Sequence, residues 1–402
     1  MRLHGRGLTV AMCLGQIGNL LPHVAVPAVM AEHLMPAWRL TASEAGLMAS
    51  AFAIGYMLAV PVLATLTDRI DARPILIVGS SLSGLATLAF GLLAAGLASA
   101  ALIWGLAGVG FAGAYMPGLK ALTDRLQTGH ASRSITLYTA TYSLGVGLSF
   151  LVAQLAAARC GWRMAFYLTG LGPLAMIAAA LLLDPVHPKA HARALLDLMP
   201  VVRNRSALGY VLGYGAHCFE LYALRTWIVA FWGYVAAHNG GDALLDPISI
   251  SFLVTVLAMP SSILGNEAAI RFGRHRAIVC FMALSAVLAA GIALTAGARP
   301  APLLLLTVAY AAAIPADSGA LTSGMSLSAQ PEYRGATMAL HSTVGFGLSA
   351  VGGWSVGAAL DVGGGIGSAA GWLAAFLIMG AGGVCGPLAL YWSRRRVLLQ
   401  RV

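Results

Sequence analysis

The feature that most constrains this chain is a succession of apolar runs of about 20 residues, with charged residues gathered where one run ends and the next begins. A helix of that length spans about 30 Å, the thickness of a bilayer's hydrocarbon core. A membrane β-barrel would instead need strands of about ten residues with alternating character. We therefore predict an all-α integral membrane protein with twelve transmembrane helices, near residues 8–30, 43–66, 75–97, 100–121, 135–158, 163–183, 207–235, 249–270, 277–296, 301–325, 335–357 and 370–392.

The composition excludes a soluble domain. Charged residues make up 9% of the chain and apolar residues 59%, whereas a soluble domain carries roughly 25% charged residues. So few polar side chains cannot cover the surface of a water-soluble fold. The lipid bilayer is therefore the environment in which we expect this chain to fold.

The basic residues set the expected orientation, because cytoplasmic loops accumulate Lys and Arg. With both termini in the cytoplasm, the outer loops hold only Arg39, Arg159, Arg163 and Arg299, and every other Lys and Arg except Arg225 falls in the inner segments. This bias and anionic lipid at the inner face account for the formal net charge of +10. Nucleic acid is not an expected partner, since no basic stretch is interleaved with aromatic residues that could stack on bases.

Landmarks in the first half of the chain recur in the same order in the second half. The sequence RSIT at 133–136 opens the fifth predicted span and RGAT at 334–337 opens the eleventh, while Gly-Trp pairs open the sixth and twelfth. A basic loop follows both the second and the eighth span. Such a repeat predicts two six-helix pseudo-symmetric halves. The expected division is a first half at 1–184, a cytoplasmic linker at 185–205 and a second half at 206–402.

Three loops carry a family resemblance. The segment "LTDRIDARP" at 66–74 follows the second span, "IRFGRHR" at 270–276 follows the eighth, and "PEYRGATMAL" at 331–340 precedes the eleventh. Together with the twelve spans and the central linker, these loops resemble those of the major facilitator superfamily across essentially the whole chain. The first motif is partial, because Asp71-Ala72 stands where that family usually has glycine and arginine.

The resemblance implies a mode of action. In this family substrate binds between the two halves at mid-membrane, and rocking of the halves exposes the site to each side in turn. The resemblance also implies a cytoplasmic gate containing Asp68, Arg69 and Arg73, whose contacts form in one state and break in the other. The alternative is that these residues only mark topology. We expect a monomer in a bacterial plasma membrane, the inner membrane, with no cofactor.

The seventh predicted span carries ionisable side chains near its middle. The segment "GAHCFELYALRTW" at 215–227 contains His217, Glu220 and Arg225. A charge at the bilayer centre costs about 2.5–3.5 kcal/mol on insertion scales, so these residues require partners or water. Glu220 and Arg225 are badly spaced for an ion pair on one helix, which prefers separations of three or four residues. We expect each to meet another helix or a cavity, and a purely structural network is the alternative.

Other spans supply polar residues that fit the same site. Those on the first span form a stripe spaced i, i+3, i+7, those on the fifth share one face, and Pro315 breaks the tenth. Each residue also has an interpretation as a packing or capping group. We expect substrate contacts from Arg225, His217, Gln16, Asn19, His23, Tyr138, Tyr142 and His341, and proton coupling through Glu220 and Asp317.

These residue types indicate a transport chemistry. A carboxyl group surrounded by hydrocarbon is a candidate proton carrier, and His217 could share a proton with Glu220. Arg225 offers a planar fork that matches a carboxylate or a similar anion. The leading hypothesis is a secondary active transporter that moves a small anionic or zwitterionic organic solute together with protons.

Other functions stay open at this point. The alternatives are a drug or metabolite efflux antiporter, a transition-metal ion transporter, and a non-transporting receptor or assembly factor on the same fold. A resident metal site is not expected. The sequence contains no recognisable set of nucleophile, base and oxyanion donors and no nucleotide-binding glycine loop, so we do not expect an enzyme.

Overall fold

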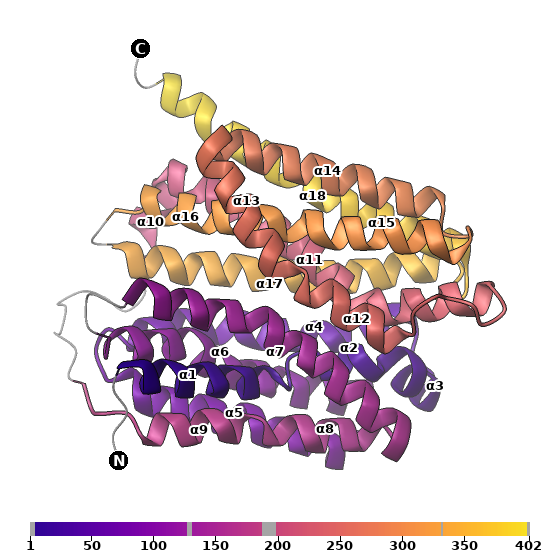
Figure 1. The fold of residues 1–402 in the computed structure, drawn as a ribbon, viewed down its shortest axis with the longest axis horizontal. Helices are drawn as coiled ribbons and strands as arrows, with labels where there is room; N and C mark the ends of the chain where they lie inside the picture. The colour runs from indigo at the N-terminus through magenta and orange to yellow at the C-terminus, as the bar shows by residue number, and fades with distance from the viewer. Residues whose placement is uncertain (1–4, 127–130, 187–197, 331–332, 400–402) are drawn as a thin grey trace. The chain divides into compact units, whose positions relative to one another are not determined.

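The computed structural model describes residues 5–126, 131–186, 198–330 and 333–399, and their regular structure is helical throughout (Figure 1). The chain forms two compact units. Unit 1 comprises Met1–Val29 and Ala51–Asp197, and unit 2 comprises Met30–Ser50 and Leu198–Val402. Residues 187–197 of the predicted linker lie outside the described residues.

The predicted spans correspond to helices in the described part of the chain. Ten helical segments are long and apolar enough to cross a membrane, and a bent pair at the N-terminal end makes an eleventh. The remaining predicted span is α11 (Arg205–His238), which has 34 residues and carries His217, Glu220 and Arg225 in its interior. The expected all-α membrane architecture is confirmed.

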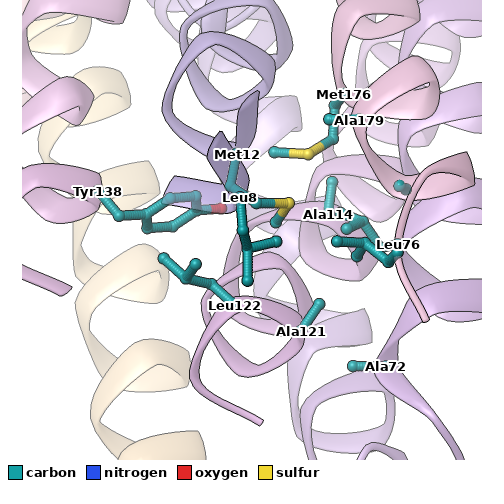
Figure 2. Close-up of a cluster of buried hydrophobic side chains, with 12 residues drawn as sticks. Leu8, Met12, Ala72, Leu76, Ala114, Ala121, Leu122, Tyr138, Met176 and Ala179 are labelled. Atoms are coloured by element: carbon teal, nitrogen blue, oxygen red, sulfur yellow. The ribbon is translucent and has the colours of Figure 1, made fainter. Parts of the chain in front are cut away.

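Unit 1 is built on the packing of α1 against α7 and α9 and of α5 against α6 and α8. Its core contains Leu8 and Met12 of α1, and Figure 2 shows the ring of Tyr138 pointing toward them. The helices of this unit are α1 (Gly5–Leu20), α2 (Ala25–Val29), the later part of α4 (Ala42–Leu66), α5 (Ala72–Leu93), α6 (Leu97–Thr123), α7 (Ala131–Cys160), α8 (Trp162–Leu171) and α9 (Pro173–Leu181).

The first span is broken in the middle. α1 ends at Leu20 and α2 begins at Ala25, and the helices on either side of the break differ in direction by 48°. Pro22 and Pro27 have no amide hydrogen, so the helical hydrogen-bond ladder cannot run unbroken across this segment. The Ser149 hydroxyl of α7 donates to the carbonyl of Leu21 (2.6 Å) and accepts from the amide of Val24 (3.2 Å). One side chain thus satisfies two backbone groups that the break leaves without helical partners.

The first span also runs further than predicted. After α2 the chain continues through a π-helical turn (η1, Met30–Leu34) and α3 (Met35–Trp38), and it ends at Arg39, which has φ of 52°. The predicted span ends near residue 30, just before Glu32 and His33. Both residues lie in the π-helical turn. Glu32 is exposed and His33 is partly exposed, so their polar side chains do not have to end the helix.

Unit 2 is organised around α11, which packs against α17 and α18, while α14 packs against α18. Its core contains Val211, Ile278, Leu321 and Leu390. The helices of this unit are the first residues of α4, α10 (Met199–Arg203), α11, α12 (Pro247–Val256), α13 (Ala258–Phe272), α14 (Arg274–Leu294), α15 (Pro300–Ala313), α16 (Ser318–Ser328), α17 (Arg334–Val362) and α18 (Ala369–Leu399), together with η1 and α3.

The start of α4 is fixed by a carboxylate from α17. Asp361 accepts hydrogen bonds from the backbone amides of Ala42 and Ser43, both at 2.8 Å, and from the Ser43 hydroxyl. Further along α4, the Ser50 hydroxyl donates to the carbonyl of Ala350 at 2.7 Å. The first amides of a helix have no partners within it and carry partial positive charge, so a carboxylate is the natural cap.

The tenth span is the second broken one. A 3₁₀ turn (η2, Ile314–Asp317) separates α15 from α16, and it begins just before Pro315. The proline removes one amide donor and tightens the backbone locally. Asp317 is the last residue of this turn and is buried. The break therefore presents a carboxylate in the interior of unit 2.

Candidate functional site

The centre of the site is a buried pair between α11 and the break in the tenth span. The Nδ1 atom of His217 lies 2.7 Å from Oδ1 of Asp317, and both side chains are 3% exposed. The sequence suggested instead that His217 would share a proton with Glu220, three residues away on the same helix. The structure joins His217 to Asp317 because His217 faces η2, where the break delivers the Asp317 carboxylate into the protein interior.

Aromatic rings extend this pair. The ring of Tyr214 is stacked on that of His341 from α17, with centroids 3.8 Å apart, and also lies parallel to that of His217 at 5.5 Å. His341 is buried. The two histidines singled out in the sequence are therefore brought together by Tyr214, which the sequence analysis missed. The available signal was its position one helical turn before His217.

Glu220 faces a different part of unit 2. The Ser285 hydroxyl of α14 donates to its Oε2 atom at 3.0 Å, and the Tyr310 phenol of α15 interacts with the same carboxyl group. On a third side, a Cβ added to Gly383 of α18 would lie 2.7 Å from Oε2, so a side chain at this position would require the carboxylate to shift. Glu220 is thus enclosed by α14, α15 and α18, whereas His217 faces η2. No sequence pattern predicted that Ser285 or Tyr310 would contact Glu220.

Arg225 lies five residues beyond Glu220 on α11 and is buried, with 4% of its surface exposed. Its guanidinium carbon lies 5.4 Å from the centroid of the Tyr222 ring, a cation–π distance. The cation therefore has an aromatic neighbour on its own helix. A buried guanidinium retains its charge, so Arg225 adds a fixed positive charge to this half of α11.

Unit 1 gathers the polar residues of the first and fifth spans. The Tyr138 hydroxyl donates to Oε1 of Gln16 at 2.8 Å, and the Tyr142 hydroxyl lies 3.0 Å from Nε2 of His23. The ring of His23 is surrounded by those of Phe52 and Phe111, with centroids 5.1 and 5.0 Å away. Gln16 and His23 of the predicted stripe therefore each pair with a tyrosine of α7. Asn19 lies between Gln16 and His23 on the stripe and is fully buried.

The loop after the second span forms a network within unit 1. Arg125 binds Asp71 through Nη2, at 2.8 and 2.9 Å from the two carboxylate oxygens, and donates from Nε to the carbonyl of Asp184 at 2.7 Å. Burial alone raises the pKa of Asp71, but the hydrogen bonds from Arg125 and from the amides of Arg73 and Val186 outweigh it, so this pKa lies below its ordinary value. Asp71, which departs from the resembled motif, thus forms a partly buried ion pair with Arg125.

The three predicted gate residues have separate positions in this loop. Arg73 donates to the carbonyls of Ala180 and Leu181, both at 3.0 Å, and so binds the C-terminal end of α9. Asp68 and Arg69 lie in the turn after α4, where their amides donate to the carbonyls of Thr65 and Leu66. The role of these three residues as a gate stays a prediction.

Metal binding can be examined directly. In the described parts of the chain, no three His, Cys, Asp or Glu side chains gather into a group that could hold a metal ion. His217 and Asp317 form a pair without a third such ligand, and Glu220 faces Ser285.

Comparison with known proteins identifies the family. Residues 8–353 match the model of the Major Facilitator Superfamily. The chain belongs to this superfamily.

Its relatives include proteins named spinster. Protein spinster of Drosophila melanogaster is 27% identical over 237 residues, which are 55% of this chain but only 38% of that protein. A bacterial homologue of the human lysosomal transporter Spinster, solved in an inward-facing and occupied conformation, has a TM-score of 0.75 at 16% identity, with 96% of each chain covered. The nucleoside transporter NupG has a TM-score of 0.74 at 13% identity, with 96% of this chain and all 100% of that chain covered. At these identities the solved structures show the shared fold.

Proposed function

We propose that this superfamily member moves a small anionic or zwitterionic organic solute across the membrane together with protons, by alternating access. The observation that carries the proposal is the buried contact of 2.7 Å between His217 and Asp317, at a break in a membrane span. Ionisable groups inside a membrane protein are costly and mark ion and proton pathways. A structural pair has no need of a broken helix, whereas a transport site uses one to present polar groups.

The pair can bind and release a proton as one group. At 2.7 Å, one proton between Nδ1 of His217 and Oδ1 of Asp317 holds the two side chains together. Protonation of Asp317 removes the negative charge that holds His217. Because Asp317 ends the 3₁₀ turn, loss of this contact frees η2 to change its position relative to α11. Proton binding is thereby linked to the conformation of the tenth span.

Arg225 supports an anionic group on the solute. Its charge is permanent and its guanidinium presents donors in a plane that matches a carboxylate. The Tyr222 ring lies within cation–π distance of it. His217 and His341 contribute further contacts in unit 2, and Gln16, Asn19, His23, Tyr138 and Tyr142 contribute those of unit 1. A zwitterion or a carboxylic acid with polar substituents suits this set.

Glu220 is the second proton-coupling residue of the proposal. It is enclosed by Ser285, Tyr310 and Gly383, and its carboxyl group gains hydrogen bonds in either protonation state, because a hydroxyl can donate or accept. Such an enclosure accommodates the charged and the neutral carboxyl group without rearrangement of the helices.

The remaining parts of the proposal follow from the loops. Asp68, Arg69 and Arg73 form a cytoplasmic gate, and the halves 1–184 and 206–402 move about the linker 185–205. The bias of Lys and Arg supports cytoplasmic termini. The proposal takes the chain as a monomer in a bacterial plasma membrane, the inner membrane.

The test is transport by the purified protein in liposomes that contain a pH-sensitive dye. The panel contains small organic acids, amino acids, inorganic anions and nucleosides, the last because NupG is a nucleoside transporter. We expect a solute-dependent pH change in the wild type, which Asp317→Asn and Arg225→Ala abolish. The matched control is His238→Gln, since His238 is an exposed histidine at the end of the same helix. Transport without a pH change would remove proton coupling, and equal transport by Arg225→Ala would remove the anion-binding role.

A further inference from the structure

Two buried amide side chains on the first span have hydrogen-bonding atoms that are not used. Gln16 and Asn19 are both 0% exposed. The Tyr138 hydroxyl donates to Oε1 of Gln16, which fixes the direction of that amide. Its Nε2 atom, and both Oδ1 and Nδ2 of Asn19, have no hydrogen-bond partner among the residues that the structure describes. One acceptor atom and two amide nitrogens are therefore unused within a single helical turn.

The break in the span does not account for these amides. An Asn one residue before the end of a helix commonly pairs with nearby backbone groups. Here the Leu21 carbonyl and the Val24 amide are both taken by Ser149. Close approach makes this possible, because a Cβ on Gly145 of α7 would lie 2.8 Å from Leu20. The backbone at the break is satisfied without Asn19, and the amide is left for another role.

An unused buried amide is costly inside a membrane protein, where no bulk water can replace the missing partner. Native structures contain few such groups, and each calls for an explanation. Gln16 and Asn19 are spaced i, i+3, so they lie on one face of α1. His23, one turn beyond Asn19, continues this face into a cluster of aromatic rings. The two amides therefore begin a polar surface that ends against aromatic side chains.

The chemistry of this surface defines a ligand group. Gln16 and Asn19 together offer N–H donors and one carbonyl acceptor, and neither carries a charge. Their complement is an uncharged group with a donor and an acceptor on the same edge, as in a carboxamide, a ureido group or a lactam. We propose that Gln16 and Asn19 bind such a group on the transported solute. This inference rests on the proposed function, to which it adds a second recognition element besides the anionic one.

Asn19→Leu tests the inference, since the replacement keeps the side chain's size and removes its polar atoms. We expect this variant to unfold at a higher temperature than the wild type in detergent without solute, because an unpaired amide has been removed. Gln154→Met is the matched control. Gln154 is a buried glutamine of α7 whose Nε2 donates to the carbonyl of Phe150, so its replacement should lower the unfolding temperature.

Ligand pairs supply the second measurement. Each pair consists of a monocarboxylic solute with a carboxamide and its methyl ester, which keeps the acceptor and lacks the donor. We expect the amide member to raise the unfolding temperature of the wild type more than the ester does, and its KM for transport to be lower by about tenfold or more. Both differences should vanish in Asn19→Leu.

The outcomes separate this inference from the proposed function. If the wild type couples anion transport to protons but treats amide and ester alike, the inference is overturned and the proposed function stands. If no solute produces a pH change, the proposed function fails, while the thermal shift still decides amide binding. A lowered unfolding temperature in Asn19→Leu, with an unchanged preference for the amide, would assign Asn19 a structural role and overturn the inference.

Discussion

The Nδ1 atom of His217 lies 2.7 Å from the carboxylate of Asp317, and the two residues belong to helical segments far apart in the chain. Neither residue could remain charged alone at this depth. We expect His217→Gln and Asp317→Asn to abolish proton-driven accumulation of solute. If the pair is a coupling site, solute counterflow without a proton gradient should persist in Asp317→Asn. Loss of both activities together with a lowered unfolding temperature would indicate a structural pair.

Neutralising Glu220 should also abolish proton coupling. Glu220→Gln keeps an acceptor for Ser285 and preserves the size of the side chain, so we expect it to fold and to retain counterflow. The measurement is accumulation of solute driven by a pH gradient. Accumulation at the wild-type level would show that Glu220 does not carry the proton.

A side chain at Gly383 should disturb the Glu220 carboxylate. Because an added Cβ would lie 2.7 Å from Oε2 of Glu220, Gly383→Ala must displace the carboxylate or α18. We expect a loss of stability of about 1–3 kcal/mol, as for overpacking of a tightly packed interior. Glu220→Ala combined with Gly383→Ala should recover much of this loss, because the clash is then removed. Thermal unfolding of the two single variants and the double variant measures the coupling.

The ion pair between Asp71 and Arg125 should make stability dependent on pH in the acidic range. The folded-state pKa of Asp71 is depressed, so its contribution is complete above the ordinary Asp value of about 3.9 and is lost as the pH falls through the folded-state pKa. Asp71→Asn should therefore lower stability at neutral pH by about 1–3 kcal/mol. This difference from the wild type should shrink below a pH of about 4. A difference that is constant from neutral to acidic pH would contradict the assignment.

Asp361 should protect the first turn of α4. Removing its charge in Asp361→Asn weakens the cap on the amides of Ala42 and Ser43, and we expect a loss of about 0.5–1 kcal/mol because the site is exposed. Hydrogen exchange at these two amides should accelerate. Ser43→Ala is the control, since it removes only the hydroxyl contact and keeps both backbone bonds. Equal exchange in the wild type and Asp361→Asn would rule out the cap.

Much of the architecture follows from the sequence. The positions of the helices are determined by hydrocarbon thickness, which requires each apolar run to reach a minimum length. The breaks in the first and tenth spans can be predicted from the sequence, because Pro22 and Pro315 remove amide donors. The end of the first span cannot be predicted in this way, because Glu32 and His33 interrupt the apolar run although the helix continues to Trp38.

The candidate residues could be found from the sequence, but their partners could not. Burial of charge in an apolar run identifies His217, Glu220, Arg225 and Asp317 without any structure. Which side chain meets which depends on the rotation of each helix about its axis. A shift of one residue rotates a helix by about 100°, so His217 and Glu220 can face different neighbours although they are one turn apart.

The sequence by itself determined that the chain lies in a membrane, where its helices are, which family motifs it carries and which ionisable residues interrupt apolar spans. It could do so because hydropathy and helical periodicity are local properties. The tertiary structure alone decided that Asp317 meets His217, that Ser285 meets Glu220 and that Ser149 fills the break in the first span. Each of these contacts joins different helices. Their geometry depends on how closely small residues such as Gly145 and Gly383 allow those helices to approach.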